Sequence, residues 1–204
     1  MKEAFIYDAI RTPRGKAKAD GSLADLSPFA LLKSLYDAIE ARTGLNQSWV
    51  QDVILGCVSQ VGEQGGNVAK ASLLVADWPD HVPAITINRY CSSGLDAINM
   101  AAMKIMTGQA TCTLAGGVEM MSRVPMLSDK AILFADSKQA LRHRMLMMGS
   151  GADLIASLYG ISRQQVDKLA LDSQQRAIYA RDQGFFASII PVYNAIKGIT
   201  LSAD

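Results

Sequence analysis

Cys91 is the residue of this chain best suited to covalent chemistry, and it lies in the stretch Asn-Arg-Tyr-Cys-Ser-Ser-Gly at residues 88–94. A short β-branched segment before it, residues 84–87, predicts a buried strand, and the apolar segment 95–106 after it predicts a buried helix. Free N–H groups at a helix start face a bound group, and the helix dipole there favours a thiolate over a thiol. Cys91 is therefore a candidate nucleophile, and the small residues after it allow a carbonyl group to approach closely.

An inert buried thiol is the alternative for every cysteine, because free cysteine behaves as a small hydrophobic residue. Cys57 and Cys112 lie within the predicted strands 53–58 and 111–114, so we favour the inert role for both. The three cysteines are widely spaced and form no CxxC pair, so we expect neither a metal site nor a disulfide framework. A reducing, cytoplasmic location fits this cysteine usage best.

Two glycine-rich segments could take part in binding. Residues 62–66 lack the spacing of known phosphate-binding loops, so a loop or subunit contact is favoured there. Residues 116–121, Gly-Gly-Val-Glu-Met-Met, follow a predicted strand. Their glycines either allow close backbone approach or end the strand in a plain turn, and the sequence leaves both open.

A general base for Cys91 is missing from the pattern, although a cysteine nucleophile needs acid–base assistance. His143 stands between two arginines and is read as part of a solvated face, with an acid–base or phosphate-binding role as the alternative. His81 lies between prolines in a predicted surface loop. The methionines Met145, Met147 and Met148 line a flexible apolar pocket or fill a core, and both remain open.

The composition is that of a globular protein that grips neither nucleic acid nor membrane. Half of the 204 residues are hydrophobic, 19% are charged and the formal net charge is +1. This composition excludes a disordered chain, and the small net charge creates no electrostatic field that would attract polyanions. No apolar run reaches the roughly 18 residues that a membrane span requires.

Strand and helix patterns alternate through the first part of the chain and predict an α/β fold. Strands are expected at 3–9, 53–58, 84–87 and 111–114, and helices at 28–43, 67–75 and 91–106. This βαβαβαβ order predicts a mostly parallel sheet with helices on both faces. Because ligands bind beyond the carboxyl ends of such strands, Cys91 is expected at the functional edge.

The pattern becomes irregular and helix-rich after Gly117. Helices are expected at about 150–159 and 163–182, the second opened by a capping box at Ser162, with short extended pieces at 189–192 and 199–201. We therefore predict an α/β core at residues 1–117 and a loop domain at 118–204. The loop domain is expected to cover the edge where Cys91 lies.

Residues 88–95 resemble the nucleophile motif of the thiolases, the acetyl-CoA acetyltransferase family. Further matches to that family's pattern occur in order along the chain, at 11–13, 115–122, 148–149, 159–163 and 173–175. The resemblance covers the amino-terminal half of a thiolase. It implies a thiolase-like fold and an acyltransferase, in which Cys91 forms an acyl-enzyme and the acyl group passes between coenzyme A thioesters in fatty acid metabolism.

The resemblance also implies substrates and partners. Acyl-CoA and CoA are the expected substrates, no bound cofactor is expected, and Met148 and Gly149 match positions that line the pantetheine pocket. The loop domain would cover the CoA, and the N–H of Cys91 would help to hold the oxyanion. A homo-oligomer, or association through the exposed face of a half-fold, is expected.

The family's catalytic histidine and second cysteine lie in a carboxyl-terminal half that this sequence does not match, so we expect the chain alone to be incomplete for turnover. Met147 also stands where many relatives have histidine. Two alternatives remain, a non-catalytic CoA-binding or partner-binding module and a ketoacyl-synthase-like condensing enzyme. The Gly-Gly-Val-Glu-Met-Met-Ser stretch at 116–122 favours the thiolase interpretation.

Overall fold

The computed structural model describes residues 2–204, which divide into two compact units. Residues 2–129 and 188–204 form the first unit, and Lys130–Ala187 form the second. The domain boundary predicted after residue 117 does not coincide with this division. Residues 118–129 and 188–204, on either side of the second unit, belong to the first. Met120 and Val192 share one buried cluster with Leu23 and Leu31, and this cluster holds the carboxyl-terminal segment to the first unit.

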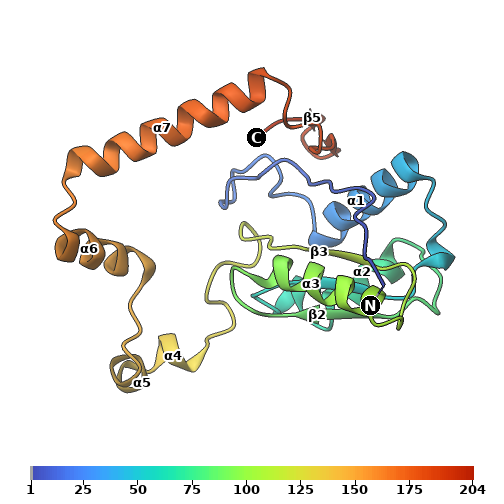
Figure 1. Ribbon diagram of the computed structural model, residues 1–204, viewed down its shortest axis with the longest axis horizontal. Helices are drawn as coiled ribbons and strands as arrows, with labels where there is room; N and C mark the ends of the chain where they lie inside the picture. Colours follow the sequence, from blue (N-terminus) through green and yellow to red (C-terminus); the bar gives the residue numbers. More distant parts are fainter. Residues whose placement is uncertain (1) are drawn as a thin grey trace. The chain divides into compact units, whose positions relative to one another are not determined.

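Three parallel strands form the sheet of the first unit, in the order β2-β1-β3 (Figure 1). They are β1 (Val53–Gly56), β2 (Ala84–Ile87) and β3 (Leu114–Gly117), and all pair in parallel register. β1 is the central strand and all four of its residues are buried. The predicted α/β class with a parallel sheet is therefore confirmed.

The two faces of the sheet are covered by different helices, as the alternation of side chains along β1 shows. Val53 and Leu55 pack in a core cluster with residues of α1 (Pro28–Thr43) and α2 (Val68–Val75). Ile54 points to the opposite face and packs with Ala97 and Ala101 of α3 (Ser93–Met106). Burial on both faces explains why β1 is a continuous apolar run.

Local sequence signals account for the ends of the helices. The Ser27 side chain accepts a hydrogen bond from the Ala30 N–H at 3.1 Å, and Pro28 occupies the first helical position of α1. Gly44 ends α1 in the left-handed conformation with φ of 69°. Asn67 caps α2 through its side-chain oxygen, which accepts from the Lys70 N–H. The predicted helix over 28–43 is confirmed at both ends.

The strand predicted at 3–9 is absent, and the strands predicted at 53–58 and 111–114 have other bounds, since β1 ends at Gly56 and Cys57 lies after it. Residues 3–9 form no strand, and only an isolated bridge joins Arg11 to Ile189. The apolar residues there lack a neighbouring strand to complete their backbone hydrogen bonds, and Tyr7 is 92% exposed. The strand expected at 111–114 begins only at Leu114, so Cys112 lies before it rather than in it.

The second unit consists of helices. These are α4 (Ile132–Ala135), α5 (Ser137–Arg142), α6 (Met148–Tyr159) and α7 (Arg163–Asp182). The capping box predicted at Ser162 is confirmed, because its hydroxyl accepts from the Gln165 N–H while the Gln165 side chain accepts from the Ser162 N–H. Both expected helices of this region are present, the first beginning slightly earlier than predicted.

The remaining elements are short. Two 3₁₀ turns, η1 (Gln47–Trp49) and η2 (Gly62–Gln64), lie in the first unit. The extended pieces near the carboxyl end pair as an antiparallel hairpin of β4 (Val192–Asn194) and β5 (Ile199–Leu201). Among the described residues, no helix is both long and apolar enough to cross a membrane.

Gly56, the last residue of β1, allows the start of α3 to lie directly against the sheet. A Cβ atom at this position would come within 2.5 Å of the Ser93 carbonyl carbon and 2.7 Å of the Gly94 nitrogen. Gly117 on β3 makes a similar approach, since its Cβ would lie 2.8 Å from the Gly56 oxygen. The close-approach interpretation of the second glycine-rich segment therefore holds for Gly117.

We expect the substitution Gly56→Ala to lower the free energy of unfolding by about 3 kcal/mol, because the added methyl group meets backbone atoms that cannot rotate away. Gly116→Ala is the matched control on the neighbouring strand, where the added Cβ meets only Leu55 at 3.6 Å. That control is expected to stay within about 1 kcal/mol of the parent chain. Urea unfolding followed by circular dichroism measures both, and equal effects of the two variants would contradict the prediction.

Candidate active site

Cys91 lies in the turn between β2 and α3 and its side chain is exposed. α3 begins at Ser93, with Ser92 as its N-cap residue. The sequence therefore placed this residue correctly, just beyond the carboxyl end of a parallel strand. Because the first N–H groups of α3 begin beside Cys91, a reacting carbonyl group at this thiol would lie at the positive end of the helix dipole.

The turn is shaped by Tyr90, which adopts a left-handed backbone conformation with φ of 49°. The Asn88 side-chain oxygen accepts the Tyr90 N–H at 2.8 Å. The Ser93 hydroxyl donates to the Tyr90 carbonyl oxygen at 2.5 Å and accepts the Arg89 N–H at 2.8 Å. Side-chain hydrogen bonds therefore hold the backbone on both sides of the residue that precedes Cys91.

A polar network joins the ends of β1 and β3 beneath this turn. Glu119 accepts hydrogen bonds from the Val58 N–H at 2.8 Å and from the Gln64 side-chain amide at 2.9 Å. Gln64 is fully buried, and its oxygen accepts the Met120 N–H. The Asn88 amide group donates to the Val58 carbonyl oxygen at 3.2 Å, which connects the network to the Cys91 turn.

Sequence reasoning missed the pairing of Gln64 with Glu119. Both residues lie in the glycine-rich segments that it singled out, but the 55 positions between them hid the contact. The usable signal was the parallel order of strands, which places the residues after β1 and β3 at one edge of the sheet.

The other two cysteines are not comparable to Cys91. Cys57 is 1% exposed, and burial, with a smaller contribution from the Glu119 charge, raises the pKa of its thiol to about 12. Burial also raises the pKa of the Cys112 thiol above its ordinary value. Both thiols therefore remain protonated near neutral pH, in line with the inert role favoured from sequence.

The remaining candidate residues are exposed, apart from Met145, which is half-buried. His81 lies in a turn before β2, and His143 ends α5 in the second unit. Met148 and Gly149 open α6, also in the second unit, with Met147 as the N-cap residue. Met147 and Met148 are too exposed to fill a core. The structure thus describes Cys91 and the pair Met148 and Gly149 in separate units, and the role of the pair as pocket residues stays a prediction.

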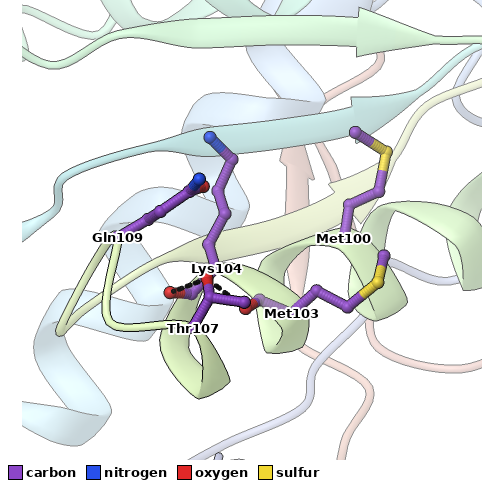
Figure 2. A pocket seen from close by; sticks show the side chains of 5 residues that line it. All are labelled: Met100, Met103, Lys104, Thr107 and Gln109. Carbon is purple, nitrogen blue, oxygen red and sulfur yellow. Dashed lines mark hydrogen bonds between the residues drawn. The ribbon is translucent and has the colours of Figure 1, made fainter.

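A hollow of about 290 Å³ opens on the far part of α3 and is separate from the Cys91 turn. Figure 2 shows that Met100, Met103 and Lys104 of α3 line it together with Thr107, which caps the helix, and Gln109. The Lys104 ammonium pairs with Asp52 at 2.8 Å, and the Thr107 hydroxyl donates to the Met103 carbonyl oxygen of the helix. Leu95, Ile98 and Met103 also leave apolar surface exposed on α3, and the expected association stays a prediction.

The fold and this turn define an α/β protein with an exposed cysteine where a central helix begins. The family model described as "Thiolase, N-terminal domain" matches residues 4–202. The chain belongs to the thiolase family, and the resemblance carried by residues 88–95 is confirmed.

Curated relatives agree with this assignment. The 3-ketoacyl-CoA thiolase of Shewanella denitrificans is 41% identical over 195 residues, which cover 93% of this chain and 49% of the relative. The 3-ketoacyl-CoA thiolase of Bacillus subtilis is 41% identical over 193 residues, covering 94% and 49%. The β-ketoadipyl-CoA thiolase of Acinetobacter baylyi is 40% identical over 216 residues, covering 94% and 52%.

A solved structure shows the same fold. The acetyl-CoA acetyltransferase of Bacillus anthracis superposes with a TM-score of 0.85 at 30% sequence identity, covering 100% of this chain and 55% of that one. The chain therefore spans about half the length of the relatives that it matches.

We expect an alkylating reagent such as iodoacetamide to modify Cys91 alone in the folded chain. Cys91 is exposed, whereas Cys57 is buried with a thiol that stays protonated near neutral pH. Peptide mass spectrometry would locate the label, and Cys91→Ala should remove it while Cys112→Ser should not. Rapid labelling of Cys57 without denaturant would contradict the structure.

Loss of the Glu119 carboxylate should destabilise the first unit. Glu119→Ala leaves the Val58 N–H without its acceptor and removes one acceptor of the buried Gln64 amide, which still donates to the Ser59 carbonyl oxygen at 2.9 Å. The expected cost is about 1–3 kcal/mol. Glu63→Ala is the matched control, because it also removes one carboxylate but breaks only an exposed pair with Arg123, at a cost of about 0–1 kcal/mol. The midpoints of urea unfolding compare the two variants, and a larger loss for Glu63→Ala would refute the role of the network.

Proposed function

We propose that this chain carries the acyl-accepting half of a thiolase site, in which Cys91 takes up the acyl group of a coenzyme A thioester for transfer to a second one. The observation that carries the proposal is the exposed cysteine at the start of α3, in the motif that places the chain in the thiolase family. The relatives named 3-ketoacyl-CoA thiolase and acetyl-CoA acetyltransferase support coenzyme A thioesters as the substrate class.

The first step is the formation of an acyl-enzyme. The Cys91 thiolate adds to the thioester carbonyl carbon, and the new carbon–sulfur bond gives a tetrahedral oxyanion. The backbone N–H of Cys91, at the start of α3, donates to this oxyanion. The intermediate then loses CoA as a thiolate, which takes up the proton that the Cys91 thiol gave up.

The second step returns the acyl group to an acceptor. Either free CoA attacks the acyl-enzyme, or the carbanion of a second acyl-CoA does so, and Cys91 leaves as a thiolate. Met148 and Gly149 are proposed to contact the pantetheine arm, as the matching family positions imply. The family signature extends into the second unit, since the match runs to residue 202.

The second step requires a group that moves protons, and the first unit offers none beside Cys91. No hydrogen bond joins the Cys91 thiol to a histidine, carboxylate or second cysteine within residues 2–204. His81 is the histidine of the first unit, and it is exposed in a turn before β2. We therefore propose that the 204-residue polypeptide accepts an acyl group but does not complete turnover.

Incubation of the purified chain with acetyl-CoA should add one acetyl group at Cys91, because the nucleophile and its helix start are present. Intact mass measures the addition, and peptide mass spectrometry places it. Cys91→Ala should abolish the addition, whereas Cys112→Ser, which removes a thiol elsewhere, should keep it. Acetylation at another residue, or steady formation of acetoacetyl-CoA by this chain alone, would contradict the proposal.

A further inference from the structure

We infer that Asn88 is a positioning residue, which holds Tyr90 in the left-handed conformation and thereby places Cys91 at the start of α3. The inference rests on the proposed function of Cys91 and adds a residue that acts on it through the backbone. It is carried by the geometry of the turn, in which the Asn88 and Ser93 side chains bond the Tyr90 backbone and the Ser92 N–H donates to the Arg89 carbonyl oxygen at 3.1 Å.

Tyr90 adopts a conformation that its side chain disfavours. A positive φ costs a residue with a Cβ roughly 1–2 kcal/mol, so surrounding contacts must hold it there. The Tyr90 side chain does not provide that support, because it is 57% exposed. The hydrogen bonds to the Tyr90 backbone therefore keep φ at 49°.

Asn88 supplies the bond on the amino-terminal side of this residue. Its side-chain oxygen accepts the Tyr90 N–H at 2.8 Å, which closes a local turn of the kind that asparagine favours. Its amide group donates to the Val58 carbonyl oxygen at 3.2 Å. One side chain thus ties the residue before Cys91 to the end of β1, where Glu119 holds the Val58 N–H.

Ser93 supplies the bond on the carboxyl-terminal side. Its hydroxyl donates to the Tyr90 carbonyl oxygen, and its own N–H donates to the same oxygen at 3.0 Å. Ser93 is buried against Gly56 and belongs to α3, so it moves with the helix. Tyr90 is thus held between Asn88 and Ser93, directly before Cys91 and the start of α3.

A double-mutant cycle tests this role, with the iodoacetamide labelling rate of Cys91 and its rate of acetylation by acetyl-CoA as readouts. Asn88→Ala should slow both by about tenfold, because Tyr90 leaves the left-handed region. Glycine adopts a positive φ without the Cβ penalty, so the same change made in the Tyr90→Gly background should cost less than about twofold. This loss of additivity is the expected result, since a general loss of stability would change the rates by the same factor in both backgrounds.

Asn46→Ala is the matched control. Asn46 is also exposed and accepts the N–H of the second residue after it, Ser48, at 2.9 Å, but it lies far along the chain from Cys91. Its substitution should leave both rates unchanged. Labelling of the buried Cys57 serves as an internal measure of unfolding in every variant.

Asn88→Asp is the second variant, to be used if labelling of Cys57 shows that Asn88→Ala unfolds the chain. The aspartate keeps an acceptor for the Tyr90 N–H and loses only the donor to Val58, so its rates should stay within about threefold of the parent chain. The inference would be overturned if Asn88→Ala kept the labelling and acetylation rates of the parent chain, or if Asn88→Asp slowed them tenfold. Equal losses of rate in the parent and Tyr90→Gly backgrounds would also overturn it. A parent chain that is labelled at Cys91 but not acetylated would refute the proposed function and leave the labelling cycle intact as the test of Asn88.

Discussion

The close contact between the end of β1 and the start of α3 is the constraint on which the site depends. Gly56 has no side chain, so the backbone of Ser93 and Gly94 can lie against the central strand of the sheet. That contact fixes the helix start, and the turn carrying Cys91 must then fit the short path from β2 to α3. Tyr90 accordingly takes a left-handed conformation, and Asn88 and Ser93 hold it. The packing of Gly56 against the start of α3 therefore determines where the exposed Cys91 thiol lies.

The polar network beneath the turn joins the ends of β1 and β3 through Gln64 and Glu119. Glu119 and Gln64 satisfy N–H groups that the ends of β1 and β3 leave unpaired. Buried polar groups are stable only when every member has a partner, so this network also determines how the two strand ends are spaced. Its Glu119 carboxylate acts on the buried Cys57, where it adds to the effect of burial in keeping the thiol protonated. Cys57 and Cys91 therefore differ in the surroundings of their thiols, because Cys57 is buried and Cys91 is exposed.

The thiolase assignment and the geometry support one division of labour. The first unit carries Cys91, the proposed nucleophile, at the start of α3, and the second unit carries Met148 and Gly149 in α6. The chain spans about half the length of its relatives, and the groups that a thiolase uses to move protons are not found beside Cys91 among the described residues. In the proposed function, acyl transfer to Cys91 uses the cysteine and the start of α3, whereas completion of the cycle also requires a group that moves protons.

The sequence alone determined the class of fold, the helix ends and the location of the nucleophile, because these depend on local patterns. Ser27 and Pro28 define the start of α1, the apolar runs define β1 and β2, and the motif around Cys91 identifies the family. Only the tertiary structure decided features that depend on partners far along the chain. Residues 3–9 have a strand-like pattern but no neighbouring strand, Cys112 lies outside the sheet, and residues 188–204 pack with the first unit. The pairing of Gln64 with Glu119 and the left-handed Tyr90 arise for the same reason, since each satisfies a contact that exists only after β1, β3 and α3 have packed together.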